Sequence, residues 1–211
     1  MLALAPARAL RTPLARALST SPPRALGFSG TLPLTGALST LVLYVRPPVV
    51  EARTDGFELP LDADAASSVL STAYPPGEDA AARELRIPDF ALTPDPVAAG
   101  VLAAVGARLG KRVGAAAFRL NALGEGGALS KRKDEEGEGH LGTLTVALPA
   151  QFVGGALVAS DGAETASFDF GAAGQGKALA WAFHPRGADY EVRPVDKGTL
   201  VSVSYKVFEA K

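Results

Sequence analysis

Short apolar runs separated by turn residues fill the second half of the chain. The runs that predict strands are residues 118–123, 142–148, 155–160, 164–170, 177–184, 190–195 and 199–208. Asp161-Gly162 between two of them is a strong hairpin signal. A turn at Pro185-Arg186-Gly187 is expected to close a hairpin between 177–184 and 190–195, and another turn is expected at Asp196-Lys197-Gly198. Many short strands with regular turns favour a sandwich, a barrel or a jelly roll.

The first half of the chain mixes strands with helices. Residues 41–45 and 57–61 fit short strands, and 85–90 fits an edge strand because Pro88 cannot donate a backbone hydrogen bond. Asp62 or Asp64 is suited to cap a helix that ends near residue 73. A second helix is predicted after Asp95, because apolar residues then recur at helical spacing. Its apolar positions are Val97, Val101, Leu102, Val105 and Leu109.

Composition narrows the possible functions. The chain has 211 residues, a net charge of −1 and no cysteine. This length favours one domain, which we place at residues 27–211 with a core at about 114–208. The balanced charge does not indicate a nucleic-acid partner, and the lack of cysteine excludes disulfides and thiolate sites. No apolar run approaches the roughly 18 residues needed to cross a membrane, so no membrane partner is expected.

Residues 1–26 differ from the rest of the chain. They contain four arginines and three serines or threonines near the end of the segment, and the first acidic residue of the protein is Glu51. This composition predicts a mitochondrial or other organelle-targeting segment, and the alternative is a disordered tail on a cytoplasmic protein. On either interpretation, deleting residues 1–26 should change the melting temperature by no more than a few degrees. A larger drop in a thermal melt would show that the segment belongs to the fold.

The charged stretch between the first two predicted strands holds the candidate chemistry. The glycines at 124–127 lack the Lys-Ser or Lys-Thr of a phosphate loop, and no Gly-x-Ser-x-Gly elbow exists. Lys131 to Lys133 beside Asp134 to Glu136 are most simply a solvated loop. The acids lack the alternating spacing of a calcium loop. His140, one of two histidines, follows these carboxylates.

The region from about Phe118 to Tyr205 resembles an Fe(II)/2-oxoglutarate-dependent dioxygenase of the prolyl 4-hydroxylase type. The residues that carry the resemblance are Gly126-Gly127, Asp134, Gly142-Thr143-Leu144, Leu148-Pro149, 154–158, Trp181, 191–195, Gly198 and Tyr205. The resemblance implies a mainly β (α+β) fold, a double-stranded β-helix or jelly roll with flanking N-terminal helices. It also implies Fe(II) and 2-oxoglutarate as cofactors, if the protein is active.

The family holds iron with two histidines and one carboxylate. In this chain the resemblance puts Asp134 at the carboxylate, Arg132 at the first histidine and Tyr190 at the distal histidine. The positions that hold 2-oxoglutarate fall on Leu123, Leu200 and Ser202, which are mostly substituted. Arginine is a permanent cation and cannot ligate iron.

Two functions therefore remain open. The first is a catalytically degenerate domain that acts as a scaffold or binds a peptide or small molecule in the jelly-roll cleft, with Arg132 paired to Asp134 in the former metal pocket. The second is an active dioxygenase, a hydroxylase of a protein or small molecule, with unusual ligands. Its tentative metal ligands are Asp134, His184, Tyr190 and His140. Tyrosine is a known iron ligand.

Overall fold

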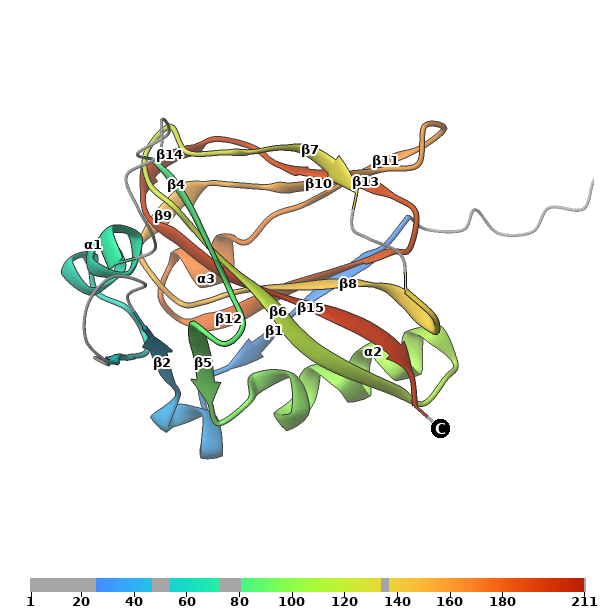
Figure 1. Ribbon diagram of the computed structural model, residues 1–211, viewed down its shortest axis with the longest axis horizontal. Coiled ribbons are helices and arrows are strands. Elements are labelled where there is room, and N and C mark those ends of the chain that lie inside the picture. The colour runs from blue at the N-terminus through green and yellow to red at the C-terminus, as the bar shows by residue number, and fades with distance from the viewer. Residues whose placement is uncertain (1–25, 47–53, 73–80, 134–136, 211) are drawn as a thin grey trace, which may run out of the picture.

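The computed structural model describes residues 26–46, 54–72, 81–133 and 137–210, and its main feature is a pair of facing antiparallel sheets (Figure 1). The larger sheet has the order β1 (Phe28–Pro33), β12 (Ala178–Pro185), β8 (His140–Ala147), β15 (Leu200–Glu209), β6 (Val113–Leu123) and β4 (Ala82–Arg86). The smaller sheet has the order β11 (Thr165–Phe168), β10 (Leu157–Ser160), β13 (Asp189–Val192) and β7 (Leu129–Lys133). The predicted mainly β jelly-roll architecture is confirmed.

Smaller elements surround these two sheets. One pair joins β14 (Val195–Gly198) to β9 (Phe152–Gly154), and a three-stranded sheet has the order β3 (Asp55–Glu58), β2 (Val42–Val45) and β5 (Phe90–Thr93). The helical elements are η1 (Gly36–Thr40), α1 (Ala63–Thr72), η2 (Val97–Val101), α2 (Leu102–Leu109) and α3 (Gly171–Gly174). Helix α2 lies on the side of the larger sheet that faces away from the smaller sheet (Figure 1).

Alternation along β12 separates an outer face from an inner face of the larger sheet. Trp181 and Phe183 point to the same side, and both contact Phe28 of the edge strand β1. The ring centroids are 6.1 Å and 5.0 Å from that of Phe28. Arg108 of α2 lies over the Phe28 ring at 5.8 Å, so this aromatic group is on the helix-covered face.

Both helix starts follow their predicted capping residues. The Asp62 carboxylate accepts a hydrogen bond from the backbone N–H of Ala65 at 2.7 Å, and Asp95 accepts one from Val97 at 2.9 Å. Such caps satisfy backbone donors that a helix leaves unpaired at its first turn. The Tyr205 hydroxyl lies 3.5 Å from the Asp95 carboxylate. Burial and this negative charge raise the pKa of Tyr205 well above its usual value of 10.0.

The pairing of strands differs from the local predictions in several places. Residues 85–90 do not form one strand, because a turn at Ile87 and Pro88 separates β4 from β5. β4 is nevertheless an edge strand. The predicted loop at 131–133 is part of strand β7, and β1 and β9 were not predicted at all. These three strands are short or rich in charged and small residues, so periodicity alone does not distinguish them from coil. The turn expected at 196–198 was also wrong, because these residues belong to β14 and pair with β9.

The turn at 185–187 was predicted to close a hairpin, and this prediction was wrong. β12 pairs with β1 and β8 in the larger sheet, whereas β13 pairs with β10 and β7 in the smaller sheet. The chain therefore crosses from one sheet to the other at this turn. The crossing places residues of β12 and β13 opposite each other across the interior rather than side by side.

Some predictions fall on residues outside the described ranges. Residues 1–25 lie there, so the targeting segment stays a prediction, as does the division into one domain. The boundary at residue 26 was wrong by one residue, because Leu26 is buried in the core. Asp134 also lies there. Among the helices of the described residues, none has the length and apolar content to span a membrane.

Candidate functional site

A set of buried polar residues covers the inner face of the larger sheet. Strand register places Arg119 opposite Ser204, Asn121 opposite Ser202, and His184 opposite Thr143. Residues paired in this way share one face of a sheet. We call the set the polar floor: Arg119, Asn121, Thr143, Thr145, His184, Ser202 and Ser204. All seven are buried, so their polar groups depend on partners inside the protein.

Tyr190 reaches the polar floor from the smaller sheet. Its side chain is 3% exposed, and its hydroxyl oxygen accepts a hydrogen bond from Nη1 of Arg119 at 2.6 Å. The Tyr190 ring lies against the ring of His184, with 4.8 Å between centroids and an interplanar angle of 32°. Tyr190 therefore connects both sheets at the position that the resemblance assigns to the distal iron ligand.

Glu84 pairs with three guanidinium groups: that of the exposed Arg86 through Oε1, and those of Arg119 and Arg132 beside Tyr190. Its Oε2 atom lies 2.8 Å from Nη1 of Arg132 and 3.3 Å from Nε of Arg119. Arg132 also donates to the Asn121 side-chain oxygen at 3.4 Å and lies over the Tyr190 ring at 5.4 Å. We call Glu84, Arg119, Arg132 and Tyr190 the arginine cluster. The arginine cluster contains two guanidinium cations and one carboxylate, and most of the surface of these side chains is buried.

The electrostatics of the cluster keep Arg132 charged. Burial by itself would lower the pKa of Arg132, but the Tyr190 phenol and the Glu84 carboxylate outweigh that effect and raise the pKa. Side-chain exposure is 8% for Arg119, 29% for Arg132 and 28% for Glu84. A cation so placed repels a divalent metal ion, while it attracts an anion.

The structure brings several predicted site residues together. Arg132 and Tyr190 are partners in the β7–β13 pair, and His184 contacts Tyr190 from the larger sheet. Leu123 and Leu200 are opposite each other in the β6–β15 pair and are almost fully buried. Ser202 follows two residues after Leu200 on the same face, opposite Asn121. The described carboxylate partner of Arg132 is Glu84, since Asp134 lies outside the described residues.

His140 is placed differently. It lies at the start of β8, opposite Phe208, and is 8% exposed. Within the described part of the chain, neither of its ring nitrogens has a hydrogen-bond partner. No described contact joins His140 to the arginine cluster.

Sequence reasoning missed Glu84 and Arg119. Arg119 is a lone charge within the apolar run 118–123, and this was a signal that one position of the strand faces a polar interior. Glu84 gave no comparable signal. It stands between Arg83 and Arg86, and such a charged segment predicts solvent-exposed side chains. Within the described residues, no group of three or more histidine, aspartate and glutamate side chains is arranged to hold a metal ion.

No protein-family model matches the chain, and a search of curated proteins finds no similar sequence. Solved structures resemble it at low sequence identity. A 2OG-Fe(II) oxygenase family oxidoreductase from Burkholderia pseudomallei is 15% identical, with a TM-score of 0.46, over 70% of this chain and 79% of that one.

Two prolyl hydroxylases are also similar. One, from Trichoplax adhaerens in complex with a hypoxia inducible factor peptide fragment, is 13% identical with a TM-score of 0.40, over 61% of this chain and 63% of that one. The other, a prolyl-4-hydroxylase from Pseudomonas putida, is 12% identical with a TM-score of 0.37, over 62% of this chain and 73% of that one.

Proposed function

We propose that this protein is a 2-oxoglutarate/Fe(II) oxygenase-like domain whose metal and cosubstrate positions are replaced, and that it acts as a binding or scaffold module. The observation that carries the proposal is the arginine cluster. Arg132, at the first-histidine position, is a cation held 2.8 Å from Glu84. A site built around two guanidinium groups is suited to an anionic or hydrogen-bonding ligand rather than to a metal ion.

The residues at the cosubstrate positions support the same proposal. 2-Oxoglutarate carries two carboxylates, and the family pairs the far one with a basic residue. Here that position is Leu200, which is 1% exposed and lies opposite the equally apolar Leu123. An unpaired carboxylate buried there would cost several kcal/mol. A peptide or small molecule that binds in the cleft would instead meet the polar groups of the arginine cluster.

An active dioxygenase remains the second candidate, because His184 and Tyr190 lie 4.8 Å apart between ring centroids. Together with Asp134 they would supply one imidazole, one phenol and one carboxylate. Iron, when bound to such a set, would supply the activation of oxygen for hydroxylation of a protein or small molecule. Against this candidate, the Tyr190 hydroxyl already accepts a hydrogen bond from Arg119.

An anaerobic Fe(II) titration, with and without 2-oxoglutarate, tests the proposal. We expect no binding of iron at micromolar concentration by calorimetry and no iron-dependent release of succinate in air. Iron binding that is lost in His184→Ala but kept in His140→Ala would overturn the proposal in favour of the active dioxygenase. Binding that is unchanged in both variants would point to Asp134 and Tyr190, and would equally contradict a degenerate site.

A further inference from the structure

A cavity of about 570 Å³ opens at the end of the molecule where β14 pairs with β9. Its principal lining residues are Gln151, Phe152, Val153, Gln175, Lys177 and Lys197. This volume falls in the range of about 300–1,000 Å³ that is typical of small-molecule sites. The oxygenase resemblance assigns no role to any of these six residues.

Backbone hydrogen bonding fixes the walls of this cavity. In the β14–β9 pair, Lys197 is opposite Val153 and Gly198 is opposite Phe152. An isolated antiparallel bridge joins Gln151 to Gln175. Gly198 has φ of 77°, and a Cβ atom there would lie 2.1 Å from the carbonyl oxygen of Gln151, so only glycine allows this close approach. Backbone pairing therefore holds these walls of the cavity together.

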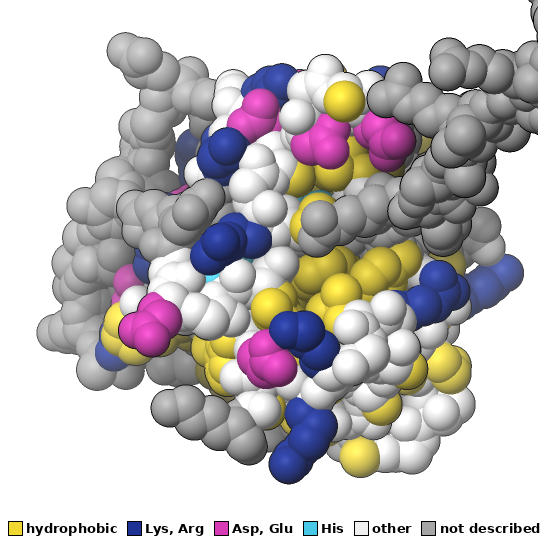
Figure 2. All heavy atoms as spheres, turned by 90° about the vertical axis from the view of Figure 1, so that its right-hand side faces the viewer, with side chains coloured by type: hydrophobic (Ala, Val, Ile, Leu, Met, Phe, Trp, Pro, Cys, Tyr) yellow, Lys and Arg dark blue, Asp and Glu magenta, His cyan; other side chains and the backbone are white. Residues whose placement is uncertain are grey.

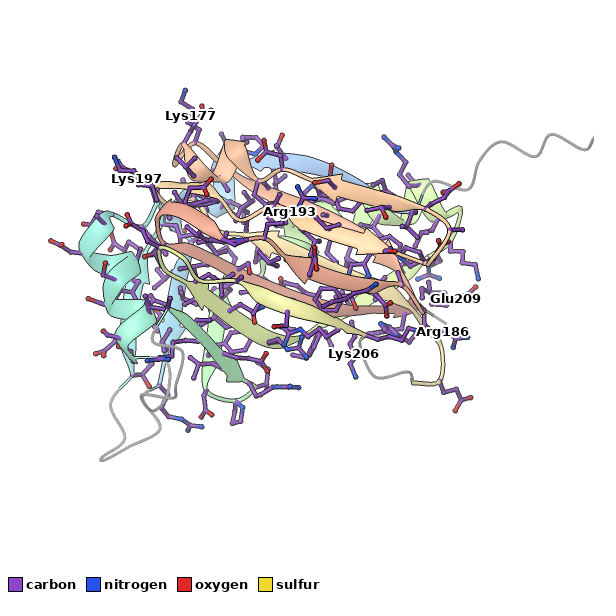
Figure 3. The ribbon with its side chains drawn as sticks, turned by 90° about the horizontal axis from the view of Figure 1, so that it is seen from above. Lys177, Arg186, Arg193, Lys197, Lys206 and Glu209 are labelled. Atoms are coloured by element: carbon purple, nitrogen blue, oxygen red, sulfur yellow. The ribbon has the colours of Figure 1, made fainter. Side chains whose placement is uncertain are left out.

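The charges around the cavity are unbalanced. Figure 3 shows Lys177 and Lys197 at the same end of the molecule. Among the described residues, neither ammonium group has a carboxylate within 4.0 Å, whereas the third charged lining residue, Glu125, already accepts a hydrogen bond from the Gly198 N–H at 3.2 Å. Within the part of the chain that the structure describes, Lys177 and Lys197 therefore line the cavity without an acidic partner. An anion bound between them would gain from both charges.

Two apolar residues, Phe152 and Val153, also line the cavity. Val153 is 57% exposed, which is unusual for a large aliphatic side chain of this protein, and Phe152 lies beside it along β9. Contact with an apolar ligand would remove this surface from water, at about 25 cal/mol for each Å². The complementary ligand therefore has an apolar body and a negatively charged end.

We propose that this cavity binds a small organic anion, with its carboxylate facing Lys177 and Lys197 and its apolar body against Phe152 and Val153. The site is separate from the arginine cluster. Along the β6–β15 pair, the buried Leu123 and Leu200 lie between the two, with Glu125 and Gly198 on the cavity side and Arg119 and Ser204 on the other. The proposal therefore goes beyond the function proposed above and does not depend on it.

Titration of the full chain with 4-phenylbutyrate, followed by NMR amide shifts, tests this site, and the neutral 4-phenylbutanamide serves as the matched ligand. We expect saturable shifts around residues 151–153 and 175–177 with a Kd below about 1 mM, and at least tenfold weaker binding of the amide. The double variant Lys177→Gln/Lys197→Gln should weaken binding of the acid at least about tenfold. The variant Val153→Ser should weaken both ligands.

The control variant is Lys133→Gln/Lys206→Gln, which makes the same change in net charge. Figure 3 shows Lys206 at the lower edge of the view, well away from Lys177 and Lys197 at the upper left. This control should bind 4-phenylbutyrate like the wild type. The proposal is wrong if no saturable binding occurs below about 1 mM, if acid and amide bind equally, or if the control loses as much affinity as Lys177→Gln/Lys197→Gln. A thermal melt of each variant excludes loss of fold as the cause, since all four lysines carry solvent-accessible side chains.

Discussion

Replacing Leu200 with lysine is expected to lower the free energy of unfolding by about 4 kcal/mol, the largest effect predicted for this protein. Leu200 is 1% exposed and lies opposite Leu123, which is fully buried. Gly155 also approaches it closely, because a Cβ atom there would lie 2.7 Å from Leu200 Cδ2. An ammonium group at this place would lose its water, and neither Leu123 nor Gly155 offers it an acceptor side chain.

Urea denaturation measures this loss, and Leu200→Met is the matched control. Methionine conserves volume and apolarity, so it should cost less than about 1.5 kcal/mol. Because Leu200 falls on the basic cosubstrate position of the resembled family, the result also bears on function. If Leu200→Lys is as stable as Leu200→Met, the pocket accommodates a charge, and one substitution would suffice to restore a carboxylate partner there.

Replacing Glu84 with glutamine is expected to cost about 2–3 kcal/mol of stability, measured in the same way. Glu84 is the described carboxylate between Arg119 and Arg132, so glutamine would leave two guanidinium groups facing each other in a mostly buried place. Breaking a fully buried pair costs about 3–5 kcal/mol. The partial exposure of Glu84 and Arg132 reduces that figure, since water screens their charges.

Two further variants separate this effect from a general loss of charge. Adding Arg132→Met to Glu84→Gln removes one of the two facing cations, and should recover at least about 1 kcal/mol. Glu209→Gln breaks the exposed pair with Lys111 and should cost less than about 1 kcal/mol. Equal losses in Glu84→Gln and Glu209→Gln, or a further loss in the double variant, would show that the arginine cluster is not an electrostatic unit.

Local patterns identified most of the strands and both long helices. The cap Asp95, and Asp62 as one of two candidates, were recognised because a cap depends on residues two or three positions away. The Asp161-Gly162 turn was recognised for the same reason, and it joins β10 to β11 as predicted. Such local patterns did not predict which sheet each strand joins. An extended segment shows the same alternation whichever strand it pairs with, so the crossing between β12 and β13 was mistaken for a hairpin.

The sequence by itself determined a strand-rich fold of the sandwich, barrel or jelly-roll type, and the resemblance added the jelly-roll class and the site positions Arg132 and Tyr190. These conclusions rest on patterns that each lie within one short segment. Only the tertiary structure decided that Glu84 and Arg119 join them, since Glu84 and Arg132 are 48 positions apart in the chain and Arg119 and Tyr190 are 71 apart. Side-chain contacts between such distant residues arise when two sheets pack face to face. No local pattern specifies that packing, because it minimises the exposed apolar area of the whole chain.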